Sequence, residues 1–406
     1  MDPNASPPFQ GLRVIELAQW VFVPVAGALL ADWGADVIRI ERLEGDPYRG
    51  LATQGIGTDR DGVNLSMALA NRGKRSVALN LRHETGLAVL HELLATADVF
   101  LTSLRPGALS RLGLDADTLR DRYPSLIYAR GHGFGTRGPD ANQPGYDSSA
   151  FWARGGVGHI LTPPERDYPI SQRGAMGDRN GAMALAFGIA AALLKRSKTG
   201  VGSVVDVSLL ATAMWMLSSD LLAVLNGGAA GPVGGCGPQV NPLTGNYRTK
   251  DGRHIQLMFL QGDRYWPEFC RLVGREDLID DPRFADLAAR RANSDACVAE
   301  LDAVFARLTF AEWKELLAEL DAPWAPVQSV QEVIDDPQVV ANDYVGEVRL
   351  DDGAAYRLPS VPVQLDEQAP PLRRAPEHGE HTEALLLELG YDWDRISKLM
   401  EQGVIP

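Results

Sequence analysis

Cysteine is scarce in this chain of 406 residues, which has three: Cys236, Cys270 and Cys297. They form no CxxC pair, and an odd number of cysteines cannot all be joined to one another. The sequence therefore argues against a disulfide framework and against a structural zinc site. It is typical of a protein from a reducing cytoplasm.

Long apolar runs and a signal-peptide pattern are also missing. The first eight residues are rich in proline and include no Lys or Arg, and the apolar stretch 182–194 is too short and too interrupted to span a bilayer. We therefore expect a soluble, cytoplasmic protein.

An excess of positive charge is absent as well. The chain has 39 Lys and Arg against 53 Asp and Glu, a net charge of -14, which disfavours a general nucleic-acid or anionic-membrane binder. Its 45% hydrophobic and 23% charged residues are ordinary for globular domains, and its length predicts two or three of them. An anionic ligand would need a local basic cluster.

The common nucleotide and hydrolase motifs do not occur. The turn after the first predicted strand, residues 18–24, holds bulky side chains instead of GxGxxG, so a dinucleotide pyrophosphate has no open backbone to approach. GxxxxGK[ST], HExxH and GxSxG are also absent, and there is no internal repeat or coiled coil.

What is present is an alternation of strands and helices. Strands are predicted at 12–17, 36–41, 76–80, 98–102, 126–130 and 204–207, and helices at 24–33, 84–95, 179–195 and 208–225, the last two largely buried. This order predicts a parallel sheet covered by helices. The Gly-, Pro- and Asp-rich stretch 131–173 is expected to be a long functional loop that contacts substrate.

A second, smaller α+β region is predicted beyond residue 226. Six glycines within 226–238 indicate either a linker or a loop that closes over a ligand. A hairpin at Asp251-Gly252 and helices near 263–273, 294–307 and 309–320 follow. The tail adds a hairpin at Asp352-Gly353 and a helix near 381–389.

Asp178 precedes an apolar helix and has glycines on both sides. One interpretation is a helix N-cap, because a carboxylate there accepts unpaired backbone N–H groups. The other is a nucleophile, which must be both charged and reachable, as Gly177 and Gly181 would allow.

Three further groups of residues are open to two interpretations each. The basic cluster 71–76, with arginines at 39, 42, 82, 105 and 111, is either a solvated face or a phosphate site. His132 follows a strand, where general bases occur, but no partner is visible and a structural role is the alternative. The aromatic residues Trp20, Phe22, Phe151, Trp152 and Trp215 line a pocket or belong to the core.

Several segments together follow one family pattern: 11–17 with Pro24, 30–41, 71–76, 97–99, 105–107, Gly177-Asp178, 188–193, 198–202 and 379–382. On these segments the chain resembles the CaiB/BaiF family, the class III coenzyme A transferases, over essentially its whole length. The resemblance implies a Rossmann-like large domain (1–225, completed by 326–406), a small α+β domain (226–325) and an interlocked homodimer whose active sites combine both chains.

The resemblance also implies the chemistry. Asp178 would attack an acyl-CoA thioester, giving a mixed anhydride and then an aspartyl-CoA thioester, from which CoA passes to a carboxylic acid. Acyl-CoA would be a substrate, and no tightly bound cofactor or metal is expected. Matching positions imply CoA contacts at Val21, Phe22, Arg42, Arg82, Ser103, Leu104, Arg105, Arg111 and His132.

The chain departs from the family pattern at two positions, which bear on substrate class. Val21 stands where related transferases have Gln. Tyr146 stands where the family's α-methylacyl-CoA racemases have the His of a Gly-His-Asp motif, which favours a transferase over a racemase. Gly234 and Gly235 resemble the family's glycine-rich flap, with a plain linker as the alternative. A CoA-binding paralogue without turnover is the non-enzymatic hypothesis.

Overall fold

The computed structural model describes residues 7–50, 59–60, 63–233, 241–350 and 352–406. Two compact units divide the chain: residues up to Gly234 together with Val340–Pro406, and Gly235–Val339. The chain returns to the large unit later than the expected residue 326. An ion pair of 2.8 Å between Arg253 and Glu332 joins the segment after that residue to the small unit.

The large unit is built on a six-stranded sheet whose strands are all parallel, in the order β5-β2-β1-β6-β7-β8. The strands are β1 (Arg13–Leu17), β2 (Asp36–Glu41), β5 (Arg75–Ala78), β6 (Val99–Thr102), β7 (Ile127–His132) and β8 (Val204–Ser208). In the central strands, Ile15 lies opposite Ile38 on one side and Phe100 on the other. Apolar residues of this kind are typical of parallel strands that are buried on both faces. The predicted parallel sheet is confirmed.

The strand order reverses between β1 and β6, which makes this pair the switch point of the sheet. In open parallel sheets, ligands bind beyond the carboxyl ends of the strands at such a point. The fold alone therefore directs attention to the loops that follow β1, β2 and β6.

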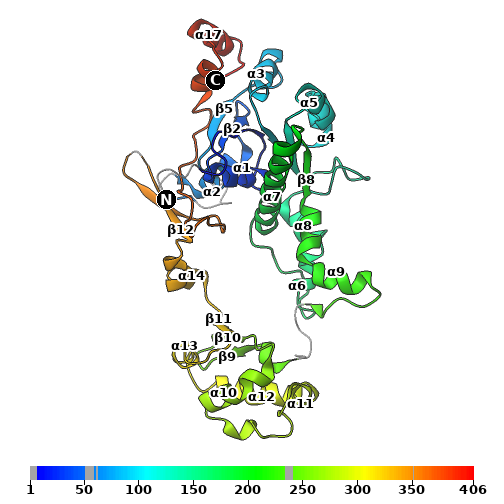
Figure 1. The fold of residues 1–406 in the computed structure, drawn as a ribbon, viewed down its shortest axis with the longest axis vertical. Helices are drawn as coiled ribbons and strands as arrows, with labels where there is room; N and C mark the ends of the chain where they lie inside the picture. Colours follow the sequence, from blue (N-terminus) through cyan, green and yellow to red (C-terminus); the bar gives the residue numbers. More distant parts are fainter. Residues whose placement is uncertain (1–6, 51–58, 61–62, 234–240, 351) are drawn as a thin grey trace. The chain divides into compact units, whose positions relative to one another are not determined.

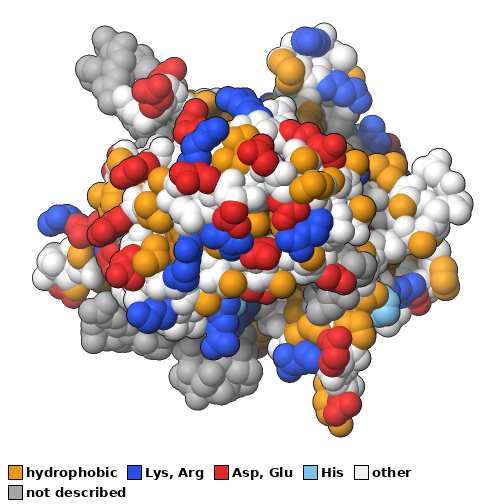
Figure 2. All heavy atoms as spheres, turned by 90° about the horizontal axis from the view of Figure 1, so that it is seen from below, with side chains coloured by type: hydrophobic (Ala, Val, Ile, Leu, Met, Phe, Trp, Pro, Cys, Tyr) orange, Lys and Arg blue, Asp and Glu red, His pale blue; other side chains and the backbone are white. Residues whose placement is uncertain are grey.

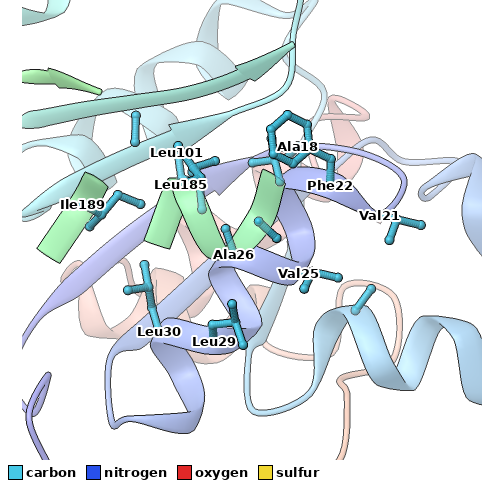
Figure 3. Packing of buried hydrophobic residues seen from close by; sticks show 14 of the residues in the cluster. Ala18, Val21, Phe22, Val25, Ala26, Leu29, Leu30, Leu101, Leu185 and Ile189 are labelled. Carbon is cyan, nitrogen blue, oxygen red and sulfur yellow. The ribbon is translucent and has the colours of Figure 1, made fainter. Parts of the chain in front are cut away.

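One face of the sheet is covered by α1 (Phe22–Asp32) and α7 (Met176–Thr199). Every residue of α1 is buried, and Figure 3 shows its Ala26 and Leu30 on the side of Leu185 and Ile189 of α7. A helix apolar on all sides fits a position between a sheet and a second helix.

The opposite face is covered by helices from both ends of the chain. These are α3 (Glu84–Leu94), α4 (Pro106–Arg111), α5 (Ala116–Arg122), α16 (Thr382–Glu388) and α17 (Trp393–Glu401). Figure 1 places the C-terminal helix α17 in the same part of the large unit as β5 and α3. The structure adds α17, which the sequence patterns did not predict.

Shorter elements complete the large unit. They are the turn η1 (Pro47–Gly50), strands β3 (Asp59–Arg60) and β4 (Val63–Asn64), helix α2 (Leu65–Asn71), the π-helix η3 (Asp147–Ala153), helices α6 (Val157–Leu161), α8 (Leu209–Met216), α9 (Ser218–Leu225) and α15 (Pro337–Ala341), and the hairpin β12 (Val345–Arg349) and β13 (Ala355–Pro359). The hairpin predicted around Asp352-Gly353 is confirmed.

Three expectations for this unit are wrong. The stretch 131–173 is not a continuous loop, because it contains η3 and α6. The helix expected over 208–225 is broken at Leu217 into α8 and α9. Helices α7 to α9 are not largely buried: in this single chain Phe187, Trp215 and Leu225 are 76%, 80% and 76% exposed.

The small unit pairs a three-stranded antiparallel sheet, in the order β11-β10-β9, with helices. Its elements are η5 (Pro242–Thr244), β9 (Asn246–Arg248), β10 (His254–Leu257), α10 (Gly262–Leu272), η6 (Glu276–Leu278), α11 (Leu287–Ala292), α12 (Ser294–Phe305), α13 (Phe310–Leu317), β11 (Trp324–Pro326) and α14 (Val330–Ile334). The core is aromatic, with Tyr247 and Phe305 stacked at 5.0 Å. The predicted hairpin and helices are confirmed here.

Surface charge, helix apolarity and metal-ligating side chains can be compared over the described residues. On the face drawn in Figure 2, Lys and Arg side chains are interspersed with Asp and Glu rather than gathered in one basic area. Among the described residues, no helix has the length and apolarity to cross a membrane. The same residues include no group of three His, Cys, Asp or Glu side chains placed to hold a metal ion.

Candidate active site

A cavity of about 500 Å³ lies at the switch point of the sheet. It is bounded by the loops after β1, β2, β5 and β6, with Leu17, Ile40 and Leu79 on its apolar walls. The exposed arginines Arg42 and Arg82 line it, together with Arg111. Apolar walls with guanidinium groups suit a ligand that has both an apolar part and phosphates.

The cavity brings together four of the nine residues expected to bind CoA, namely Arg42, Arg82, Leu104 and Arg111. Ser103 lies next to Leu104 in the chain, and its Oγ accepts a hydrogen bond of 3.0 Å from the Gln19 backbone N–H in the β1 loop. Arg105 is the exposed N-cap residue of α4 and donates to the Asn142 carbonyl at 3.3 Å.

Val21 and Phe22 do not line this cavity. Both are buried in the core at the start of α1, at 8% and 7% exposure. The Phe22 ring lies against Gly131 and Gly181, where an added Cβ would come within 2.7 Å and 2.6 Å of ring atoms. Phe22 therefore locks the start of α1 against β7 and α7.

His132, at the end of β7, has a partner that the sequence did not reveal. Its Nε2 pairs with Asp206 of β8, and its Nδ1 accepts a hydrogen bond of 3.0 Å from the Gly135 N–H. Burial opposes the charge on Asp206, but hydrogen bonds from His132 and Arg130 outweigh it and lower the pKa of that carboxyl to about 2. Both ring nitrogens are thus engaged within the protein.

In the cluster 71–76, Arg72 and Lys74 are paired inside the protein, so these two cations neither face solvent nor are free to bind phosphates. Arg72 donates to both Asp32 carboxylate oxygens at 2.6–3.1 Å, and the Lys74 Nζ lies 2.8 Å from a Glu16 oxygen with both side chains fully buried. Burial lowers the pKa of Lys74 to about 8 despite Glu16. This part of the cluster stabilises the sheet interior, since buried charges need partners.

Asp178 lies in the first turn of α7 and is not its N-cap. The helix begins at Met176, and the N-cap residue is Ala175, with φ at +61° and no side-chain cap. The interpretation of Asp178 as an N-cap is therefore wrong. In the first turn a carboxylate still lies near the positive end of the helix dipole.

The glycines around Asp178 serve close packing. A Cβ at Gly177 would lie 2.3 Å from Asp147 Oδ1 and 2.3 Å from the Phe151 ring, so the start of α7 sits directly on η3. Gly181 allows the contact with Phe22 described above. The absence of side chains at these two glycines lets other side chains of the protein come close to Asp178.

Asp178 and Asp147 form a pair of neighbouring carboxyl groups. Burial, reinforced by the negative Asp147, raises the pKa of Asp178 to about 7, and Arg179 opposes the shift. Burial likewise raises the pKa of Asp147. Two carboxyl groups in one dry place cannot both ionise easily, and strongly shifted pKa values are typical of active sites.

Three aromatic side chains, which we call the aromatic wall, stand beside this pair: Trp20, Tyr48 and Tyr146. The Trp20 ring meets Tyr146 edge to face at 5.4 Å and Tyr48 at 6.3 Å. Tyr146 is the residue before Asp147 and is 57% exposed. Burial raises the pKa of Tyr48, and the charge of Asp178 adds to that shift.

Sequence reasoning named Trp20 and Tyr146 and missed Tyr48. It noted Asp147 only as the last residue of the motif that contains Tyr146 and gave it no role of its own. Of the other aromatic candidates, Phe151 and Trp152 belong to the core and Trp215 is 80% exposed. Gly234 and Gly235 lie outside the described residues, so the flap and the linker both stay predictions.

The fold and site define an α/β protein with an arginine-lined cleft at the switch point of its sheet and a carboxyl pair at the start of the longest helix. Comparison with known proteins gives the family. The model of CoA-transferase family III matches residues 9–382, and the chain therefore belongs to that family.

Its relatives are CoA-transferases. It is 33% identical over 397 residues to (R)-2-hydroxy-4-methylpentanoate CoA-transferase of Clostridioides difficile, covering 98% of this chain and 99% of the relative. It is 36% identical over 402 residues to cinnamoyl-CoA:phenyllactate CoA-transferase of Clostridium sporogenes, covering 96% and 95%. A crystal structure of a CAIB/BAIF family protein from Brucella suis matches with a TM-score of 0.79 and 30% identity, covering 95% and 100%. The expected family and enzyme class are confirmed.

Proposed function

We propose that this protein moves CoA from an acyl-CoA donor to a carboxylic acid acceptor, with Asp178 as the nucleophile. The observation behind this proposal is the placement of Asp178: a carboxyl of raised pKa in the first turn of α7, beside Asp147 and the aromatic wall. Family membership supports the reaction class, and the position of Asp178 supports its role.

The first half of the reaction opens the donor. A carboxylate oxygen of Asp178 attacks the thioester carbonyl carbon, the C–S bond breaks, and CoA leaves as a thiolate. The product is a mixed anhydride of Asp178 and the acyl group. The thiolate then attacks the aspartyl carbonyl carbon, which releases the donor acid as a carboxylate and leaves an aspartyl-CoA thioester.

The second half reverses these steps with another acid. The acceptor carboxylate attacks the aspartyl thioester carbonyl carbon and displaces the thiolate, giving a second mixed anhydride. The thiolate attacks the acceptor's carbonyl carbon, so that the new acyl-CoA leaves and Asp178 is a free carboxylate again. No proton or electron is lost or gained overall. Water must be excluded from both anhydrides.

The raised pKa of Asp178 is consistent with this chemistry. A carboxylate that is poorly solvated reacts more readily than one in water, at the cost of a smaller ionised fraction. With a pKa of about 7, roughly half of the Asp178 groups are ionised at neutral pH. Arg179, which favours the ionised form, keeps that fraction from being smaller.

We assign the cavity at the switch point of the sheet to the binding of CoA. Arg42, Arg82 and Arg111 bind the phosphates, and Leu104 contacts an apolar part of the ligand. Ser103 and Arg105 complete the β6 loop. We assign Val21, Phe22 and His132 a structural role, since Val21 and Phe22 are buried and both nitrogens of His132 are engaged within the protein.

We also propose a homodimer in the cytoplasm. Helices α7 to α9 expose apolar side chains along their length, among them Phe187, Trp215 and Leu225. Exposed apolar areas of this kind mark protein interfaces, and a second copy of this chain would bury them.

Replacement of Asp178 tests the proposal. Asp178→Ala should abolish CoA exchange between an acyl-CoA and an acid, measured by mass spectrometry of the CoA products. The matched control is Asp117→Ala, because Asp117 is an exposed carboxylate in the first turn of another helix, α5. Full activity in the Asp178→Ala variant would refute the assignment.

Two further measurements separate the other hypotheses. Incubation with acyl-CoA alone followed by hydroxylamine should modify Asp178 if an aspartyl thioester forms, which a protein that only binds CoA would not show. Deuterium uptake at the α-carbon from heavy water, without any acceptor acid, would instead indicate a racemase.

A further inference from the structure

The carboxylate of Asp46 holds two members of the aromatic wall at once. Its Oδ1 accepts a hydrogen bond of 2.8 Å from the Tyr48 backbone N–H, and its Oδ2 accepts one of 3.2 Å from the Trp20 backbone N–H. Asp46 thereby joins the loop after β2 to the loop after β1. Its side chain is 1% exposed, so water does not compete for these bonds.

The carboxylate is itself held by Arg39 of β2. The Arg39 guanidinium is fully buried and pairs with Asp46 Oδ2 and with the Asn71 side chain. Rotating Asp46 away would leave a buried guanidinium without this partner, which is costly. Asp46 is therefore a fixed point from which the two loops are positioned.

The backbone at Trp20 needs such a fixed point. Its φ is +70°, in the left-handed region that a residue with a large side chain rarely occupies. This conformation persists only where surrounding contacts determine it, and it is typical of functional sites. The hydrogen bond from Trp20 N–H to Asp46 is one of those contacts.

The conformation places the Trp20 ring edge to face with both Tyr48 and Tyr146. Tyr146 leads into Asp147, and Asp147 packs against Gly177, the residue before Asp178. The aromatic wall is thus adjacent to the nucleophile. An acyl group joined to Asp178 would extend beside these rings.

The charges at this place disfavour a second carboxylate on the substrate. Among the described residues, the charges that act on Asp178 are the negative Asp147 and the positive Arg179. A substrate with an aryl or branched alkyl group gains contact with the rings, whereas a short dicarboxylic acid would bring a second negative charge near Asp147.

We propose that Asp46 is a positioning residue that fixes Trp20 and Tyr48 as the acyl-recognition surface, so that the enzyme selects monocarboxylic acids with an aryl or branched alkyl group. This inference rests on the proposed CoA-transferase function. Asp46 acts through the two backbones and touches no reacting atom.

The test compares phenylacetyl-CoA, acetyl-CoA and succinyl-CoA as donors with propionate as the common acceptor. The wild-type enzyme should have its highest kcat/KM with phenylacetyl-CoA and its lowest with succinyl-CoA. The Asp46→Asn variant replaces one carboxylate oxygen by an NH₂ group, which cannot accept a hydrogen bond from a backbone N–H. It should lower the ratio of kcat/KM for phenylacetyl-CoA over acetyl-CoA roughly 10-fold, mainly through KM.

The matched control is Asp36→Asn, which neutralises an ion-paired carboxylate at the start of β2, whereas Asp46 follows the end of that strand. It should leave the ratio unchanged. Trp20→Gly removes the ring and relieves the backbone strain, so Asp46→Asn added to Trp20→Gly should change the ratio much less than Asp46→Asn alone. If Asp46→Asn does not fold, Asp46→Glu keeps the charge but displaces the acceptor oxygens, and it should lower the ratio in the same direction.

The outcomes separate this inference from the function on which it rests. An unchanged ratio in Asp46→Asn, or a wild-type preference for succinyl-CoA, overturns the inference while exchange itself persists. A wild-type enzyme that exchanges none of the three donors, or an Asp178→Ala variant that retains full activity, overturns the proposed function instead.

Discussion

Removing the charge of Asp147 should make Asp178 more acidic. Asp147→Asn keeps the size of the side chain but not its negative charge, which now opposes ionisation of Asp178. If ionised Asp178 is the nucleophile, the acid limb of kcat/KM must follow its pKa. The variant should therefore stay active at lower pH than the wild-type enzyme.

The size of the effect follows from the causes of the shift. The pKa of Asp178 rises from an ordinary 3.8 to about 7, which corresponds to roughly 4 kcal/mol against the charged form. Burial is the larger cause and Asp147 the second, so removing the charge of Asp147 should reverse only part of this rise. Since the two carboxyl groups interact, the apparent pKa that the acid limb reports belongs to the pair and not to Asp178 alone.

The measurement is a pH profile of kcat/KM from about pH 5 to pH 9. With an apparent pKa near 7, about one tenth of the plateau activity remains at pH 6, and with a pKa one unit lower about one half remains. The control is Asp140→Asn, because Asp140 is a carboxylate of the same chain segment that pairs with Arg154 and does not act on Asp178.

An acid limb that stays in place in Asp147→Asn would refute this reasoning, provided that the variant has the far-ultraviolet circular dichroism of the wild-type protein. A limb that moves to higher pH would show that Asp147 assists ionisation of Asp178 in place of opposing it. A shift of equal size in Asp140→Asn would show that the net charge of the protein, and not the local pair, sets the limb.

Two further predictions concern the buried and the cleft-lining cations. Lys74→Met leaves Glu16 buried without its ammonium partner, so the free energy of unfolding should fall by about 3–5 kcal/mol in urea titrations. The control Lys195→Met, at an exposed position, should lower it by less than about 0.5 kcal/mol. Equal losses in the two variants would contradict the importance of the pair. Replacing Arg42, Arg82 or Arg111 by Gln should raise the KM for acyl-CoA roughly 10-fold each with kcat little changed. The control Arg349→Gln, at an exposed hairpin position, should leave the KM unchanged. A fall in kcat at constant KM would argue against phosphate binding by the three cavity arginines.

The parallel sheet could be predicted because local patterns suffice for it. Strands such as 13–17 and 36–41 are short apolar runs separated by a helix-length segment, and a parallel connection of that kind allows few topologies. The position of Asp178 at the beginning of a long helix was visible for the same reason.

Partners far apart in the chain could not be predicted from local patterns. Glu16 and Lys74 are 58 residues apart, and His132 and Asp206 are 74 residues apart. Without its partners the cluster 71–76 looks like a surface charge run, and His132 looks solitary. The role of Asp147 could not be predicted, because only the packing of η3 against Gly177 brings its side chain close to Asp178.

Apolar sequence also does not say what an apolar side chain will pack against. The helices over 176–225 have the composition of a core, yet Trp215 and Leu225 are exposed in the single chain. An apolar side chain can be removed from water by the core of its own chain or by an interface with a second subunit, and the composition of a helix does not distinguish the two.

The discontinuous large unit has a consequence for biosynthesis. One of its hydrophobic cores unites Leu90 and Phe100 with Leu385, Ile396 and Ile405, residues from the last part of the chain. The backbone of β5 is bonded there too, since His381 N–H donates to the Ser76 carbonyl at 2.8 Å. During synthesis the ribosome releases every residue of the small unit before the residues that close this core. One face of the sheet in the large unit is therefore only partly covered until translation is complete, and a chain stopped after residue 339 would lack part of its own interior.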